Sequence, residues 1–162
     1  MVEYKFITCW HIHAPLPQVW ELIKDIRRWH EWWRGVLEVH EIRKGNEDDI
    51  GTCFGHTWRS YLPYKLQFET EISKVLPYEC IEAIVSGELK GTGRWKFENG
   101  KKNQTIVYYH WNVMTTKPWM NLTAPLLKGV FRSNHNAVMR WGGKGIAKKL
   151  NCKVVFSHED LK

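Results

Sequence analysis

The residues with the plainest metal-binding chemistry in this chain are three histidines. His11 and His13 share one face of an expected strand, and His110 falls at the same parity on a later strand. Three imidazoles on one face could ligate a zinc-like ion. That face points to the outside of the expected sheet, however, and no acidic fourth ligand accompanies it. We therefore predict no metal site and no cofactor.

Candidates for acid–base chemistry are scattered along the chain rather than grouped. Asn134 and His135 fall on a C-terminal helical segment, Arg59 and Tyr61 belong to the segment "WRSYLPY", and Glu69 could contribute only if its strand had the opposite parity. We expect His135 to lie off the inward stripe of its helix and Arg59 to point outward. There is no Ser/His/Asp order, no helically spaced carboxylate pair and no activated cysteine. The sequence names no catalytic residue.

Aromatic residues dominate the positions that are expected to face inward. The chain has ten Trp, six Tyr and six Phe residues, and strand alternation together with helical spacing directs many of them to one interior. An aromatic lining with few polar groups suits a flat or lipid-like ligand. The residues expected to line a ligand cavity are Trp10, Trp33, Phe54, Trp58, Phe68, Trp95, Phe97, Tyr109, Trp111, Phe131, Asn134, Val138 and Trp141.

The elements that must position these side chains follow from the apolar pattern. Residues 4–13 alternate as a strand, and short helices are expected at 15–25 and 29–33, the second ending at Gly35. Six alternating runs follow from about 36 to 115, separated by turns such as "KGNEDD" and "ENGKKN", which indicates an antiparallel meander. After Pro118 the spacing is helical, with a stripe formed by Leu127, Val130, Phe131, Asn134, Val138 and Trp141.

This order of elements predicts an α+β fold. A curved seven-stranded antiparallel sheet would pack against one long C-terminal helix. Because a helix is only about 10 Å across, it cannot fill the concave face of such a sheet, and a cavity is expected between them. Trp29, Trp32 and Trp33 would then lie where the short helices meet the sheet, near the mouth. We expect one domain over 1–150 and a tail over 151–162, in which "KVVF" could pair as a strand.

Several segments in the same order carry a resemblance to the START-like superfamily, also called SRPBCC. They are "FITCWHIHAPLPQVWELIKDIRRWHEWWRGV", "WRSYLPYKLQFE", "GELKGTGRWKF", "VYYHWNVMTTKPWM" and "NHNAVMRWGGKGIAKKL". More narrowly, residues 4–150 resemble the polyketide cyclase/dehydrase and lipid transport branch. The resemblance implies a helix-grip fold with an apolar cavity. Members of the superfamily include lipid carriers, cyclases, dehydratases and hydrolases, so fold alone leaves the function open.

Two functions are therefore expected from the sequence. The first is binding of a hydrophobic small molecule, such as a lipid, isoprenoid or polyketide-like compound, with a role as a carrier. The alternative is a cyclase, dehydratase or hydrolase that acts on an aromatic or acyl substrate in the same cavity.

Composition excludes other partners and locations. The formal net charge is +7, but the basic residues are spread along the chain without a nucleic-acid motif, so we expect no nucleic-acid partner. No stretch resembles a membrane span or a signal peptide, and the four cysteines have no metal-site spacing, so a cytoplasmic protein with free thiols is expected. Trp32, Trp33 and Trp119, together with the basic charge, suggest peripheral contact with an anionic membrane.

Overall fold

An eight-stranded antiparallel sheet and a long C-terminal helix form the computed structural model, which describes residues 2–159 apart from the side chains of Leu127 and Glu159. The expected place of Leu127 on the helical stripe therefore lies outside the described side chains. The elements are β1 (Glu3–Ile12), α1 (Leu16–Lys24), the 3-10 helix η1 (Ile26–Arg28), α2 (Trp29–Trp32), β2 (Val36–Arg43), β3 (Cys53–Arg59), β4 (Lys65–Leu76), β5 (Cys80–Gly87), β6 (Leu89–Asn99), β7 (Thr105–Thr115), α3 (Pro118–Leu150) and β8 (Val154–Glu159).

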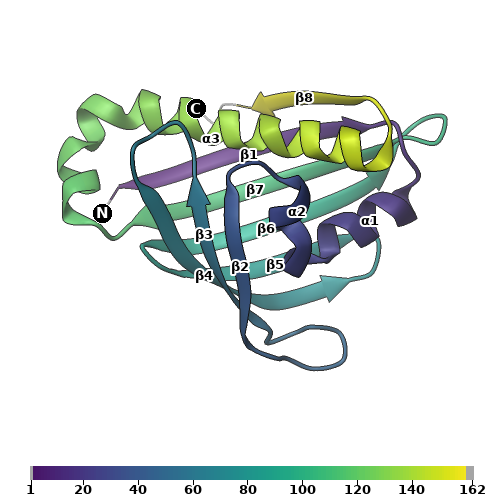
Figure 1. The fold of residues 1–162 in the computed structure, drawn as a ribbon, viewed down its shortest axis with the longest axis horizontal. Helices are drawn as coiled ribbons and strands as arrows, with labels where there is room; N and C mark the ends of the chain where they lie inside the picture. The colour runs from purple at the N-terminus through teal and green to yellow at the C-terminus, as the bar shows by residue number, and fades with distance from the viewer. Residues whose placement is uncertain (1, 160–162) are drawn as a thin grey trace.

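The strands follow one another as a meander that the first strand closes. Their order is β2-β3-β4-β5-β6-β7-β1-β8, so β1 lies between β7 and β8 (Figure 1). The α+β helix-grip fold predicted from the sequence is confirmed. The expected count of seven strands is wrong, because β8 lies within the segment predicted to be a tail. Val154 and Phe156 alternate inward from β8 and pack on the core, which gives this short strand its place on the free edge of β1.

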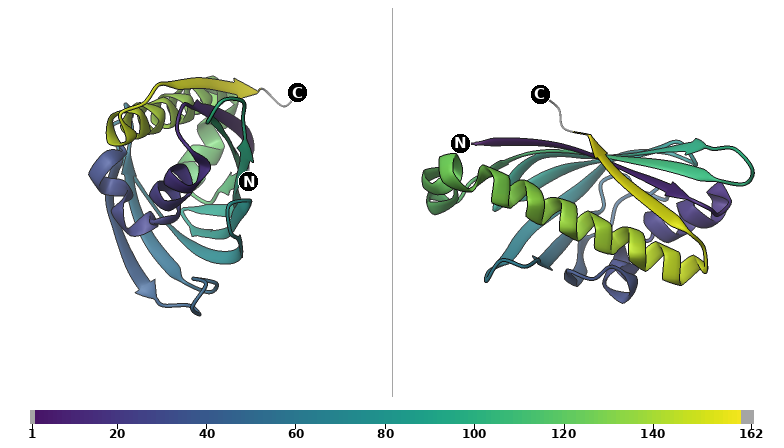
Figure 2. Two further views of the ribbon diagram at one scale, coloured as in Figure 1. Left: turned by 90° about the vertical axis from the view of Figure 1, so that its right-hand side faces the viewer. Right: turned by 90° about the horizontal axis from the view of Figure 1, so that it is seen from above.

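The sheet curls around one side of α3, as the end-on view in Figure 2 shows. α3 crosses the concave face, and α1 and α2 lie across one end (Figure 1). Val19, Trp20 and Ile23 make the buried stripe of α1, which begins after Pro15 as expected for a helix with Pro near its first turn. The N-terminal part of α3, which contains Pro125, bends away from the rest of the helix (Figure 1).

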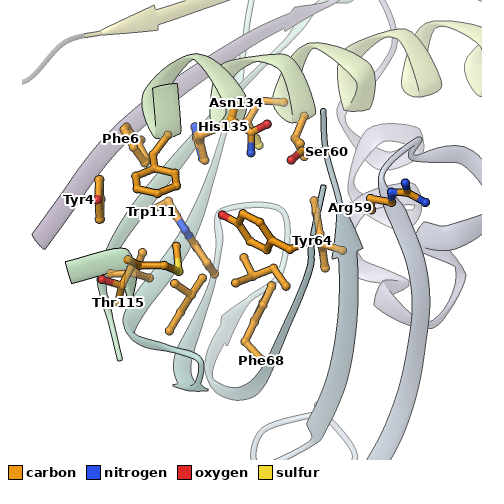
Figure 3. Close-up of a pocket in the computed structure, with 18 of the residues that line it drawn as sticks. Tyr4, Phe6, Arg59, Ser60, Tyr64, Phe68, Trp111, Thr115, Asn134 and His135 are labelled. Carbon is orange, nitrogen blue, oxygen red and sulfur yellow. The ribbon is translucent and has the colours of Figure 1, made fainter. Parts of the chain in front are cut away.

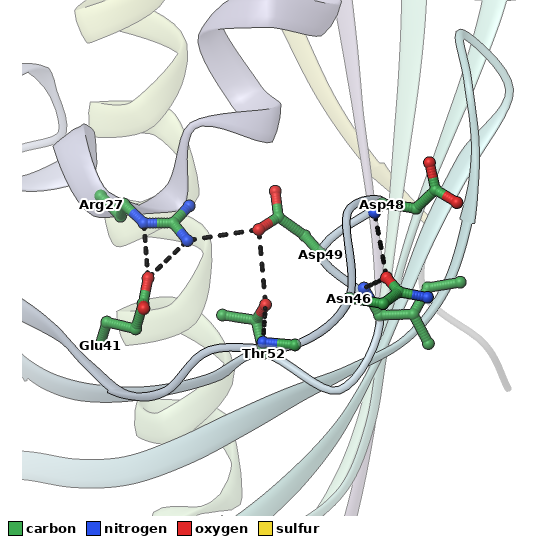
Figure 4. Close-up of polar contacts among 8 residues, drawn as sticks. Arg27, Glu41, Asn46, Asp48, Asp49 and Thr52 are labelled. Atoms are coloured by element: carbon green, nitrogen blue, oxygen red, sulfur yellow. Dashed lines mark hydrogen bonds and ion pairs between the residues drawn. The ribbon is translucent and has the colours of Figure 1, made fainter.

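A polar network fixes the loop between β2 and β3 against η1 (Figure 4). The side-chain oxygen of Asn46 accepts hydrogen bonds from the backbone N–H groups of Asp48 and Ile50, at 3.0 and 2.9 Å. Arg27 pairs with Glu41 and, at 3.3 Å, with Asp49. These contacts fix the conformation of the acidic loop.

No disulfide joins Cys9, Cys53, Cys80 and Cys152, all of which lie in the described part of the chain. Within residues 2–159, no helix has the combination of length and apolar character that a bilayer span requires.

Candidate functional site

The interior has two unlike halves, and the half beneath α1 and α2 is filled. Trp10 and Trp33 are each only 1% exposed. Their indole N–H groups donate to helix carbonyls, Trp10 to Met139 at 3.1 Å and Trp33 to Val138 at 2.8 Å. Such bonds satisfy the polar edge of each buried ring. We call this the filled half, and its packed rings are Trp10, Trp20, Trp29, Trp33, Trp95 and Phe97.

Gly142 on α3 is what allows the helix to approach these rings so closely. A Cβ atom at this position would lie 2.6 Å from the ring of Trp33 and 2.9 Å from that of Trp10. Any side chain here would therefore displace one of the two indoles. Trp29, Trp32 and Trp33 lie where the short helices meet the sheet, but not near a cavity mouth as expected: Trp29 and Trp33 are buried, and Trp32 stacks on Trp33 at a ring distance of 5.4 Å.

The other half, between the N-terminal part of α3 and the sheet, contains a cavity of about 140 Å³ (Figure 3). We call this the hollow half. Its wall is largely aromatic and aliphatic, and Arg59 is its one charged residue. The lining residues are Tyr4, Phe6, Trp58, Arg59, Ser60, Tyr64, Leu66, Phe68, Leu89, Tyr109, Trp111, Val113, Thr115, Met120, Phe131, Asn134, His135, Val138 and Met139.

The sequence-predicted lining residues divide between the two halves. Those that surround the cavity are Trp58, Phe68, Tyr109, Trp111, Phe131, Asn134 and Val138. Those that lie elsewhere in the interior are Trp10, Trp33, Phe54, Trp95, Phe97 and Trp141. The second group faces inward as expected but is buried against neighbouring rings, α3 or the β2–β3 end of the sheet. Inward direction alone does not distinguish a cavity wall from a packed core.

Reasoning from the sequence missed part of the cavity wall. Tyr4 and Phe6 lie on the β1 face that was expected to be inward, and Leu66 alternates with Phe68 on β4. The alternation that identified their neighbours could have identified these three as well. Tyr64 lies in a loop and Met120 in the first turn of α3, where no period-2 pattern applies.

Two polar side chains of α3 that face the cavity each have one atom without a hydrogen-bond partner. The side-chain oxygen of Asn134 and Nδ1 of His135 are buried and unpaired, and both point from α3 into the hollow half (Figure 3). The prediction that His135 lies off the inward stripe is wrong: its ring stacks on Phe6 with centroids 4.2 Å apart. Burial lowers the pKa of His135 to about 4, so its imidazole is neutral at pH 7.

The tyrosines of the cavity remain protonated over the physiological pH range. Burial is the main cause that raises the pKa of Tyr64 to about 12, and burial raises the pKa of Tyr109 well above its ordinary value. Tyr109 marks the boundary between the two halves, because its ring stacks on Trp95 at 3.9 Å and on Trp111 at 5.6 Å. The site thus offers hydroxyl donors and a neutral imidazole, but no carboxylate.

The other candidates for catalysis occupy the rim or the outside. Arg59 belongs to the edge of the cavity wall, but its side chain is exposed and extends away from the cavity (Figure 3), as expected from the sequence. Tyr61 is 71% exposed and contacts the ring of Trp141. Glu69 is exposed, as the predicted alternation with the inward-facing Phe68 requires. Within the described part of the chain, no three histidine, cysteine or acidic side chains are grouped as metal ligands.

A second, smaller space of about 30 Å³ lies behind the cavity and shares Trp58, Phe68, Tyr109 and Trp111 with it. His56 faces this inner space, with one ring nitrogen bonded to Thr70 Oγ1 at 2.8 Å and the other, Nδ1, buried without a partner. Burial is the main cause that lowers the pKa of His56 to about 3. A space of this volume has room for a water molecule.

Solved structures with the same fold come from several bacteria. The Zhui aromatase/cyclase from Streptomyces sp. R1128 aligns with a TM-score of 0.70 at 12% identity, over 91% of this chain and 96% of its own. A START superfamily protein from Mycobacterium smegmatis aligns with a TM-score of 0.69 at 10% identity, over 93% and 96%. A conserved protein from Geobacillus kaustophilus gives 0.67 at 14% identity, over 93% and 99%. At these identities the likeness shows the fold alone.

The sequence itself places the chain in a family. No protein with a curated description matches it. The model of the family described as polyketide cyclase / dehydrase and lipid transport matches residues 12–139, which include every strand from β2 to β7 and the part of α3 that covers the cavity. The resemblance seen in the sequence is thereby confirmed, and the chain belongs to the polyketide cyclase / dehydrase and lipid transport family.

Proposed function

We propose that the protein binds a hydrophobic small molecule, of lipid, isoprenoid or polyketide-like character, in the hollow half and acts as its carrier. The observation that carries this proposal is the cavity of about 140 Å³ walled by aromatic and aliphatic side chains. A space of that order accommodates an aromatic ring or a short acyl segment. The fold and the family both include proteins of this kind, which supports the same conclusion.

The polar groups of the cavity suggest how the ligand is oriented. Its apolar body would lie among Phe68, Trp111 and Phe131, which remove it from water. A hydroxyl or amide hydrogen of the ligand would satisfy the unpaired oxygen of Asn134 or Nδ1 of His135. Arg59, the one charged residue among the described lining residues, extends away from the cavity (Figure 3), so the part of the ligand held in the hollow half would be uncharged.

Displacement of a fluorescent apolar dye by long-chain fatty acids, isoprenoid alcohols and polycyclic aromatic compounds tests the proposal. We expect saturable binding with one site per chain. Val113→Phe, which places a larger side chain in the cavity wall, should abolish binding, whereas Ile84→Phe on the exposed side of β5 should leave it unchanged. Failure of every compound class to displace the dye, or displacement that Val113→Phe does not affect, would contradict ligand binding in the cavity.

An enzymatic cyclase or dehydratase role is the second candidate, and His135 favours it. A neutral imidazole with an unpaired nitrogen inside an apolar cavity can accept a proton from a bound substrate. Turnover of a polyketide-like substrate that is lost in His135→Gln, while dye binding is retained, would support this role. Retained turnover in that variant would exclude His135 as the base.

A further inference from the structure

The N-terminal part of α3 presents an unusual row of exposed apolar side chains. Leu122 and Leu126 are 83% and 87% exposed, and Trp119 and Val130 are each 42% exposed. Their spacing of three and four residues aligns them along one side of the helix. We call these four residues the apolar ridge. Large apolar side chains this exposed, and adjacent to one another, mark an interaction surface.

The ridge is held rigidly to the sheet by the opposite side of the same turn. The side-chain oxygen of Asn121 accepts hydrogen bonds from the backbone N–H of Val2 at 3.1 Å and from Thr115 Oγ1 at 2.6 Å. Its amide group donates to the carbonyl of Thr115 at 3.2 Å. Asn121 is fixed toward the sheet, while Leu122, about 100° further round the helix, is exposed. The exposure of the ridge is therefore built into the fold.

Charge distinguishes the class of partner that suits this surface. Every charged side chain of α3 is basic: the helix carries Lys128, Arg132, Arg140, Lys144, Lys148 and Lys149 and contains no Asp or Glu. The acidic residues close to its N-terminal end are already paired, Glu88 with Lys117 and Glu3 with Lys5. Exposed leucines and a tryptophan on a wholly basic helix are complementary to an anionic lipid surface.

The ridge is continuous with the ligand cavity. Trp119 contacts the ring of Tyr64 edge to face, with centroids 5.1 Å apart, and Tyr64 lines the cavity. Met120, the next residue of α3, lines the cavity as well. We propose that the apolar ridge docks the protein on anionic membranes, with the cavity placed beside the bilayer. This inference rests on the proposed function, because the bilayer would be the source or the destination of the ligand bound in the cavity.

This surface differs from the one that the sequence suggested. Of the three tryptophans expected to contact a membrane, Trp33 is buried and Trp32 is packed against it, so neither extends from the surface. Trp119 alone belongs to the ridge. The leucines that dominate the ridge were not singled out, because an exposed leucine on a helix cannot be told from a core leucine by its type.

Vesicle flotation with the full chain tests the docking. We expect binding to phosphatidylcholine vesicles that contain phosphatidylserine, and weaker binding at high salt or without phosphatidylserine. Leu122→Ser with Leu126→Ser should weaken binding by about tenfold or more, because each leucine loses its insertion into the acyl region. The matched control, Leu37→Ser with Ile84→Ser, removes two similarly apolar exposed side chains from strands and should bind like the unmodified chain.

Two results would overturn the proposal: no binding to either kind of vesicle, or equal binding by the ridge variant and the unmodified chain. Absence of vesicle binding together with ridge-dependent binding of an acidic protein would assign the surface to a protein partner instead. Dye binding in solution separates this test from that of the proposed function. The ridge variant should bind dye normally, whereas Val113→Phe should lose dye binding and still float with anionic vesicles.

Discussion

The filled and hollow halves of the interior are built from the same kinds of residue, yet only one of them leaves space. In the filled half α3 offers a backbone surface at Gly142, and the rings of Trp10 and Trp33 fit against it with their indole N–H groups bonded to helix carbonyls. In the hollow half α3 presents Phe131, Asn134 and His135, of which Phe131 contacts Tyr4 edge to face at 5.9 Å and His135 stacks on Phe6 at 4.2 Å. Distance between helix and sheet, set by side-chain size, decides which half is empty.

The comparison also separates the roles of the two regions. In the filled half the indole N–H groups of Trp10, Trp29 and Trp33 donate to backbone carbonyls, which is typical of a stabilising core. The hollow half leaves polar atoms of Asn134 and His135 without partners inside an apolar wall. Unpaired buried polar groups are costly to folding, so a protein that retains them commonly uses them to bind something.

Removal of a ring should affect the two halves very differently. Trp33→Ala should lower the free energy of unfolding by about 3–5 kcal/mol, because it leaves a cavity in packed surroundings and an unbonded carbonyl at Val138. Phe131→Ala should cost less than half as much, because this ring already faces empty space. Urea denaturation of both variants measures the difference, and equal losses would contradict the division of the interior.

Acid should destabilise the hollow half through His135. Its pKa is about 4 in the folded chain against 6.5 ordinarily, so the unfolded state takes up a proton first as the pH falls. The contribution of His135 to the free energy of unfolding is therefore fully present above about pH 6.5. It should decrease by about 1.4 kcal/mol per pH unit down to about pH 4.

His135→Gln should remove this contribution to the slope and leave that of His56, whose pKa is lowered in the same direction. Denaturant unfolding across this pH range provides the test. An unchanged slope in the variant would show that His135 is protonated with its ordinary pKa, and thus exposed to water in the folded protein.

Replacing each of two glycines of α3 by alanine should change the stability by small amounts of opposite sign. Gly142→Ala should destabilise the protein by about 1–3 kcal/mol, because its Cβ would overlap the ring of Trp33. Gly129→Ala should stabilise it by about 0.5–1 kcal/mol, because among the described residues no atom outside the adjoining helical backbone lies within 4 Å of its Cβ position, and alanine favours the helix. Thermal unfolding should move in opposite directions, and a shift of the same sign in both would refute the close contact at Gly142.

The sequence was sufficient for the architecture, because strand alternation, turn residues and the late change to helical spacing are local signals. It was not sufficient to divide the cavity wall from the core. Trp10 and Trp111 show the same inward alternation on neighbouring strands, yet one contacts Gly142 and the other faces the cavity. That outcome depends on which part of α3 lies opposite, a relation between residues more than a hundred positions apart in the case of Trp10.

His135 shows a second limit of the same reasoning. Successive helical residues are about 100° apart, so Asn134 and His135 cannot share a narrow stripe. Both nevertheless face the interior, because β1 curls around the helix far enough for Phe6 to stack on His135. A wider inward arc follows from the curvature of the sheet, which no pattern within α3 encodes. The strand β8 was likewise hard to assign, since its pairing depends on the free edge of β1.

Diffraction at the bromine absorption edge, from crystals grown with an ω-brominated fatty acid, tests the central claim most directly. The account predicts an anomalous peak in the space bounded by Tyr64, Phe68 and Phe131, and its loss in Val113→Phe. Crystals that contain no bromine in that space, with the rings of the hollow half closed together, would contradict it.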